Sequence, residues 1–315
     1  MSFVTLPARL RYTHWLHVEM PPKRPLRVAG EVVGYAFVYI ISAVLFGTLL
    51  TWVGGYLAGI TGADLFGALM VNWLALQVCT EGLRMADLGL LWNRWSADNL
   101  AFGLFGGVGA ACLVLGPPLL FHAARIAATP DDQPGWGAII TVGLMLAAGS
   151  AGEEICFRGY AFQTLLANYG AFATIIPVGV IFALLHAGNP NATTFGIVNT
   201  AGFGILFGFA YWRSRDLWLP IGLHFGWNFT LPLFGANVSG LRMKITGYEM
   251  SWSAGTLWSG GAYGPEASLL TSLVLLALLA YLWKAPIRRQ TSRITDPPTE
   301  SPVAGGVARS VQPPV

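Results

Sequence analysis

The chain has 315 residues, of which 54% are hydrophobic and only 10% are charged. Soluble domains carry about 25% charged residues, so this composition, with a mean hydropathy of +0.58, excludes an ordinary soluble protein. The net charge of +3 comes from dispersed basic residues, so no nucleic-acid partner is expected.

Long apolar segments follow one another along the chain without the alternation of polar and apolar residues that marks membrane strands. Several approach the roughly 20 residues that cross a bilayer as a helix. The segments are Val32–Gly54, Leu65–Cys79, Leu100–Phe121, Trp136–Ser150, Ala171–Leu185, Thr193–Trp212, Leu217–Phe234 and Ala267–Trp283. The sequence therefore predicts an all-α integral membrane protein, a bundle of about eight transmembrane helices.

The basic residues predict the orientation of this bundle. Lys and Arg concentrate before the first segment, after the second and sixth, and after the last. An even number of spans places all of these regions on one side, which the positive-inside rule assigns to the cytoplasm. We expect a multi-pass protein of the plasma membrane with both termini cytoplasmic; Arg125, Arg242 and Lys244 are the exceptions that fall outside.

Ionisable and amide side chains interrupt three segments in the second half of the chain. Each buried charge costs about 2.5–3.5 kcal/mol on insertion scales, so each needs an explanation. The side chains form three motifs, which read Glu153-Glu154-x-x-x-Arg158, Phe182-x-x-x-His186 and His224-x-x-x-Asn228. Three separate helices that each carry an unexplained polar group indicate a shared functional site.

Helical spacing gives these motifs a geometry. Glu154 and Arg158 are four residues apart and can pair across one turn, whereas Glu153 points about 100° away from Glu154. If the three helices meet, one cavity gathers carboxylates, two imidazoles, a guanidinium and an amide. Such a set can take a proton from water and can stabilise an oxyanion, which are the needs of peptide hydrolysis.

The ordered trio of motifs resembles the CPBP family, which comprises the type II CAAX prenyl endopeptidases and their bacterial relatives, the Abi proteins. The resemblance covers roughly residues 135–235. It implies that Glu153 and His186 activate the attacking water, that His224 and Asn228 stabilise the oxyanion, and that Arg158 orders the site through the glutamates. Glu154 matches the second glutamate of the motif.

With this resemblance, the chain is expected to divide into five regions. These are a cytoplasmic N-terminal arm (1–31), N-terminal transmembrane helices (32–134), a CAAX-protease-like catalytic core (135–235), an outer loop with the last transmembrane helix (236–285) and a disordered cytoplasmic tail (286–315). The expected substrate is a membrane-associated protein or peptide.

Three alternatives remain open from the sequence. Glu153, His186 and His224 could instead hold a divalent metal such as zinc, with an open fourth position. The buried Glu, Arg and His side chains could form the proton or ion relay of a transporter. The chain could also be a catalytically silent immunity or scaffold protein of the same fold.

One geometric difficulty accompanies the hydrolase interpretation. On a simple topology Glu153 lies near the cytoplasmic end of its span and His186 near the outer end of the next, a mismatch on the order of 15 Å. We expect the helix that carries Glu153 to run on past Arg158, which places Glu153 deeper. A separation above about 10 Å between Glu153 and the His186 ring would remove the basis for catalysis.

Overall fold

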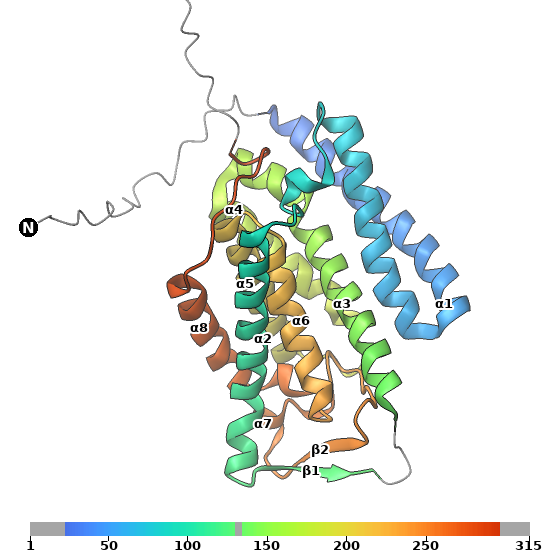
Figure 1. Ribbon diagram of the computed structural model, residues 1–315, viewed down its shortest axis with the longest axis vertical. Helices are drawn as coiled ribbons and strands as arrows, with labels where there is room; N and C mark the ends of the chain where they lie inside the picture. Colours follow the sequence, from blue (N-terminus) through green and yellow to red (C-terminus); the bar gives the residue numbers. More distant parts are fainter. Residues whose placement is uncertain (1–22, 130–133, 297–315) are drawn as a thin grey trace, which may run out of the picture.

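The computed structural model describes residues 23–129 and 134–296, which form a helical bundle with one small sheet (Figure 1). The helices are α1 (Pro25–Cys79), α2 (Arg94–Leu120), α3 (Trp136–Arg158), α4 (Tyr160–Leu185), α5 (Thr194–Ser214), α6 (Trp218–Leu233), α7 (Thr256–Ser259) and α8 (Leu269–Lys284). The strands are β1 (Ala124–Ala128) and β2 (Tyr248–Trp252), and short 3-10 turns span Met85–Leu88, His186–Gly188, Gly261–Tyr263 and Pro265–Ala267.

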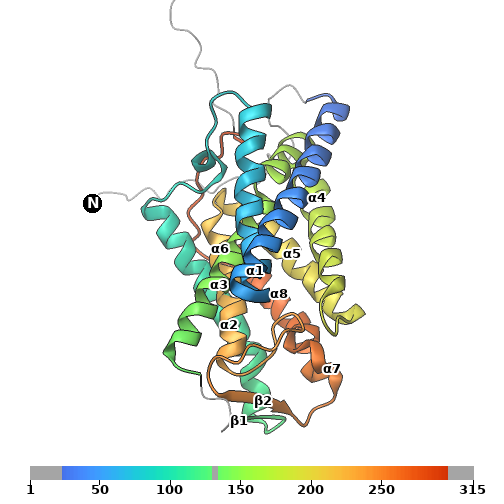
Figure 2. The same ribbon diagram turned by 90° about the vertical axis from the view of Figure 1, so that its right-hand side faces the viewer.

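Helix α1 is a hairpin of two antiparallel arms (Figures 1 and 2). Gly55 interrupts it with φ 80° and ψ −178°, a conformation that glycine adopts without steric cost. The arms pack closely, since a Cβ on Gly59 would lie 1.8 Å from the hydroxyl of Thr51. The first two predicted spans are these two arms, and the second arm begins soon after Gly55, well before the predicted Leu65.

A second interruption separates α3 from the helix that returns through the bundle. We predicted that the helix of the fourth span runs on past Arg158, but α3 ends at Arg158 and α4 starts at Tyr160. Gly170, with φ 79°, then breaks α4 into two stretches. The first stretch lengthens the path between Glu153 and the returning helix, which allows Glu153 and His186 to lie at the same level.

Helix α6 packs against α2, α3 and α5. Glycines make the closest of these contacts, because a Cβ on Gly103 or Gly107 of α2 would lie 2.3 or 2.1 Å from a carbonyl oxygen of α6. Gly222 and Gly226 face α2 in the same way, at 2.5 and 2.8 Å. This is the spacing of small residues that lets helix backbones touch in lipid, and it fixes α6, the carrier of His224, inside the bundle.

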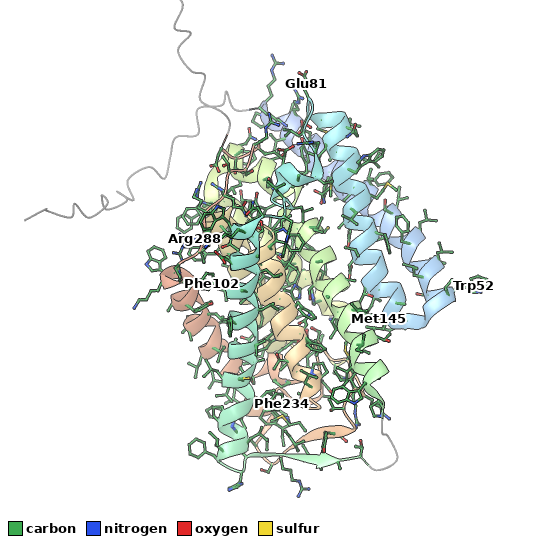
Figure 3. The ribbon with its side chains drawn as sticks, viewed as in Figure 1. Trp52, Glu81, Phe102, Met145, Phe234 and Arg288 are labelled. Carbon is green, nitrogen blue, oxygen red and sulfur yellow. The ribbon has the colours of Figure 1, made fainter. Side chains whose placement is uncertain are left out.

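Four helical stretches of the described residues are long and apolar enough to cross a membrane, namely Pro25–Cys79, Arg94–Leu120, Trp136–Gly188 and Thr194–Ser214. Helices α6 and α8 have only 16 residues each. The count of about eight spans is therefore not confirmed, although every predicted segment is helical. Large apolar side chains such as Phe37, Val44 and Trp52 are exposed, and Figure 3 shows Trp52 pointing outward, as expected for a multi-pass membrane protein surrounded by lipid.

The small sheet differs from the all-α prediction. Strands β1 and β2 pair antiparallel, with Ala124 opposite Trp252 and Ala128 opposite Tyr248. The strands have five residues each and lie in connections between apolar segments, where sequence periodicity gives little signal. The sheet joins two connections at the end of the bundle that is far from the start of α1 (Figure 1).

The C-terminal segment is ordered further than predicted. We expected disorder from residue 286, yet Ser292 and Thr295 are buried and Arg288 exchanges backbone hydrogen bonds with the Asn99 side chain. The segment has no periodic apolar residues, but polar contacts hold it against the bundle. Such contacts cannot be predicted from the hydropathy of the sequence. Residues 297–315 of the predicted tail, and residues 1–22 of the predicted arm, lie outside the described residues.

Candidate active site

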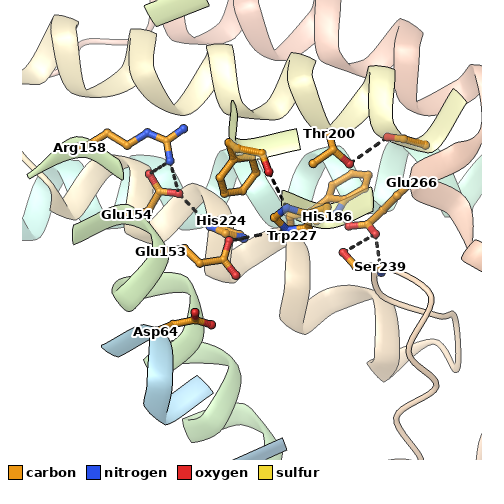
Figure 4. Close-up of polar contacts among 12 residues, drawn as sticks. Asp64, Glu153, Glu154, Arg158, His186, Thr200, His224, Trp227, Ser239 and Glu266 are labelled. Atoms are coloured by element: carbon orange, nitrogen blue, oxygen red, sulfur yellow. Dashed lines mark hydrogen bonds and ion pairs between the residues drawn. The ribbon is translucent and has the colours of Figure 1, made fainter. Parts of the chain in front are cut away.

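The three polar motifs converge on one cavity of about 270 Å³. Helix α3 supplies Glu153, the end of α4 leads into His186, and α6 supplies His224 (Figure 4). Asn228 lies one turn after His224 on α6. All four side chains line the cavity. Arg158 and Glu154 lie behind this lining and are fully buried. The structure thus brings all six predicted site residues together.

Arg158 and Glu154 form an ion pair across one turn of α3, as predicted, with Nη1 of Arg158 3.2 Å from the carboxylate. The second guanidinium nitrogen donates to the carbonyl oxygen of Gly204 at 2.7 Å. The guanidinium also lies over the rings of Phe182 and Phe207, at 5.2 and 5.4 Å from their centroids. A buried charge that is paired, hydrogen-bonded and packed in this way holds the surrounding helices in one arrangement.

Glu154 also orients the ring of His224. Nδ1 of His224 lies 2.9 Å from Oε1 of Glu154, and the imidazole stacks on Phe207 with the ring centroids 4.7 Å apart. A carboxylate can only accept a hydrogen bond, so Nδ1 carries a proton. The other nitrogen, Nε2, is thereby directed towards Glu153.

His186 is held in an equivalent way by its own helix. Its Nδ1 lies 2.8 Å from the carbonyl oxygen of Phe182, so it donates to that oxygen. The ring centroids of Phe182 and His186 lie 4.6 Å apart with their planes tilted by 45°, a contact that their spacing of one helical turn allows. Nε2 of His186 is left to face the cavity.

Glu153 stands between the two imidazoles. Its Oε2 lies 3.9 Å from Nε2 of His186 and 3.9 Å from Nε2 of His224. These distances are well inside the 10 Å limit set by the sequence argument and are too long for direct hydrogen bonds. Oε2 is buried, and none of the described protein groups forms a hydrogen bond with it. A buried acceptor of this kind normally has a water or substrate partner.

The donors do not form a metal site of the ordinary kind. In residues 23–129 and 134–296, no three His, Cys, Asp or Glu side chains are grouped closely enough to hold a metal ion. Oε2 of Glu153 lies 3.9 Å from Nε2 of each imidazole, whereas ligand atoms of a tetrahedral zinc site with bonds of about 2.1 Å lie roughly 3.4 Å apart. We therefore derive no catalytic step through a metal.

Two further acids line the cavity that the sequence motifs did not include. Asp64 comes from the second arm of α1, and Glu266 precedes α8. Glu266 accepts hydrogen bonds from the indole of Trp227 and from the backbone and hydroxyl of Ser239. Each acid adjoins an apolar segment, and this was the only sequence signal that could have identified them.

Comparison with known proteins agrees with this geometry. Residues 134–230 match the family model of the type II CAAX prenyl endopeptidases described as Rce1-like. The matched range contains all three motifs and coincides closely with the resemblance expected from the sequence. Neither the curated proteins nor the solved structures contain a match to the chain. Residues 134–230 of this membrane protein are therefore similar to the type II CAAX prenyl endopeptidases of the Rce1-like family.

Proposed function

We propose that this protein is an intramembrane endopeptidase that hydrolyses a peptide bond of a membrane-associated protein or peptide. The observation that carries the proposal is the position of Glu153 Oε2, 3.9 Å from Nε2 of both His186 and His224. We place the protein in the plasma membrane with both termini cytoplasmic, on the distribution of Lys and Arg.

In the proposed first step, a water molecule binds between Oε2 of Glu153 and Nε2 of His186. A contact of 3.9 Å between polar atoms is suited to a bridging water. Glu153 takes a proton from this water as its oxygen attacks the scissile carbonyl carbon. Nε2 of His186 accepts a hydrogen bond from the second O–H of the water, which stays on the oxygen, and this orients the lone pair; Nδ1 of His186 is committed to the Phe182 carbonyl.

The carbonyl oxygen of the substrate then becomes an oxyanion, which donors on α6 stabilise. His224 donates from Nε2 in its doubly protonated form, flanked by Glu154 at Nδ1 and Glu153 at Nε2. The amide of Asn228, one turn further along α6, is the second donor. Donors that the fold already holds in place need no reorganisation as the negative charge develops, which makes them worth more than donors in water.

Breakdown of the tetrahedral intermediate releases the two products. The carbon–nitrogen bond breaks, and the proton held by Glu153 passes to the leaving amine. Arg158 touches no substrate in this scheme. It acts as a positioning residue, because it holds Glu154 and through it the ring of His224.

The test is cleavage of a membrane-anchored peptide by the purified protein. Glu153→Ala and His186→Ala should each lower the rate by about 10²–10⁴-fold, with unfolding midpoints close to that of the wild type. Glu81→Gln is the control, because Glu81 is exposed and does not line the cavity. It lies at the top of the molecule in Figure 3. Full activity in both site variants would contradict the proposal, and proton-coupled uptake into vesicles without cleavage would favour a transporter.

A further inference from the structure

Asp64 places a third carboxylate in the cavity beside the residues of the proposed reaction. It belongs to the second arm of α1, is half-buried and lines the same cavity as Glu153. Figure 4 shows its carboxylate directed towards Glu153. Its one hydrogen bond to a described side chain comes from the hydroxyl of Tyr39 at 3.2 Å, and that donor carries no charge.

The contact between α1 and α3 fixes Asp64 in this position. A Cβ on Gly152 would lie 2.3 Å from the backbone nitrogen of Leu65 and 2.4 Å from the backbone carbonyl carbon of Asp64. The two helices therefore touch backbone to backbone at the residue that precedes Glu153. Because this contact leaves little freedom to shift, the carboxylates of Asp64 and Glu153 must share the cavity.

Carboxylates outnumber cationic side chains in the cavity lining, even with His224 doubly protonated as in the proposed reaction. Three carboxylates face it, those of Asp64, Glu153 and Glu266, and no Lys or Arg of the described residues lines it. The nearby basic residues Arg242 and Lys244 are exposed, and Arg242 pairs with Glu249 at 2.6 Å.

The three carboxylates differ in the partners they already have. Glu153 serves the proposed hydrolysis, and Glu266 already accepts hydrogen bonds from Trp227 and Ser239. The Arg158 charge is balanced by Glu154, behind the lining. Asp64 is therefore the carboxylate of the lining that is left to bind a ligand group.

A second polar group of the lining also has no partner. Ser150 is 2% exposed, faces the cavity one turn before Glu153, and its hydroxyl forms no hydrogen bond with any described protein group. A buried hydroxyl without a partner costs free energy unless a ligand or water satisfies it. A hydroxyl and a carboxylate together can accept the hydrogen bonds of an ammonium or guanidinium group.

We propose that the cavity selects peptides with a Lys or Arg side chain near the scissile bond, and that Asp64 is the counter-ion that determines this specificity. The inference rests on the proposed endopeptidase function and adds its substrate class. A cation that enters a cavity with three carboxylates gains Coulomb energy that a neutral side chain does not, and an anion is repelled.

The experiment varies the charge of the substrate and of Asp64 together. The wild-type cleavage site in one membrane-anchored peptide is first located by mass spectrometry. Each flanking residue is then replaced in turn by Lys, Gln or Glu, and kcat/KM is measured for each peptide. The protein variants are Asp64→Asn, which keeps the shape and an acceptor for Tyr39, and Asp64→Glu, which keeps the charge. Glu81→Gln is the control for loss of one remote negative charge.

At one flanking position the wild type should cleave the Lys peptide at least about tenfold faster than the Glu peptide. Asp64→Asn should reduce this ratio by about tenfold, whereas Asp64→Glu and Glu81→Gln should keep it. A wild-type ratio near one at every position would overturn the inference, whether or not the variants fold. Equal losses on all three peptides in Asp64→Asn would also overturn it, because Asp64 would then act on the reaction and not on recognition.

Failure of the proposed function gives a different result. If the wild type cleaves none of the peptides, equilibrium binding of the same Lys, Gln and Glu peptides is measured by fluorescence anisotropy. Tighter binding of the Lys peptide that is lost in Asp64→Asn would support the cation site without a protease. Equal binding of all three peptides would overturn the cation site as well.

Discussion

Nδ1 of His224 lies 2.9 Å from Oε1 of Glu154, although the two residues are 70 positions apart in the chain. The same carboxylate pairs with Arg158 one turn away on α3. Glu154 therefore links a structural ion pair to the ring that faces Glu153. In the proposed reaction the second glutamate of the motif is a positioning residue, and the first, Glu153, is the one that faces the cavity.

This link predicts a large effect of Glu154→Gln on stability. The substitution leaves the Arg158 guanidinium buried without a carboxylate, which costs about 3–5 kcal/mol. Unfolding of the detergent-solubilised protein, followed by heat or denaturant, measures the loss. The double variant Glu154→Gln/Arg158→Met should recover part of it, because it removes the unpaired charge. Equal stability of the single and double variants would show that the pair carries no such coupling.

The contact between α2 and α6 predicts a sharp difference between two neighbouring glycines. Gly107→Ala places a Cβ 2.1 Å from the carbonyl oxygen of Leu223, whereas a Cβ on Gly109 meets nothing within 4 Å. We expect Gly107→Ala to destabilise the protein by about 1–3 kcal/mol and to lower cleavage by displacing His224. Gly109→Ala is the matched control and should leave both unchanged. If the two variants unfold at the same midpoint, the close packing of α2 and α6 is wrong.

Chelation separates the metal-free reaction from the zinc alternative. Because the described His, Cys, Asp and Glu side chains form no three-donor group, EDTA and 1,10-phenanthroline should leave the rate of peptide cleavage unchanged. The same protein is measured for bound metal before and after treatment. Loss of activity that added zinc restores would contradict the metal-free scheme.

Asp216, in the connection between α5 and α6, predicts a pH dependence of stability. Burial raises the pKa of this carboxyl above its ordinary value, against hydrogen bonds from Asn99 and Gln290. The folded protein then binds the proton more tightly than the unfolded chain does. The stability contributed by protonation is present below the unfolded pKa of about 3.9 and is lost as the pH rises through the folded pKa.

Asp216→Asn, which is neutral at every pH, should therefore flatten the fall in unfolding midpoint that begins as the pH rises above about 4. The measurement compares the slope of midpoint against pH in the variant and in the wild type. Asp98→Asn is the control, since Asp98 precedes Asn99 in α2 but is partly exposed. Identical slopes for the wild type and Asp216→Asn would contradict a raised pKa at this position.

Local spacing allowed much of the site to be predicted. The helical period places Glu154 against Arg158 and Phe182 against His186, and both contacts are present. Each of the eight apolar segments is helical, because a long apolar segment in lipid has no other way to satisfy its backbone. Glu153 and His186 lie close together, but not for the predicted reason, because α3 stops at Arg158 and does not continue.

By itself, the sequence determined which segments are helical and which residues share a face, because both depend on bonds and spacing within one segment. Only the tertiary structure decided that Glu154 reaches His224 and that the α1 hairpin brings Asp64 beside Glu153. Only the tertiary structure also showed that polar contacts hold residues 286–296 against the bundle. Contacts between segments depend on where backbones approach, as at Gly152 and Gly107, and on the combined packing of many side chains, which no local period encodes.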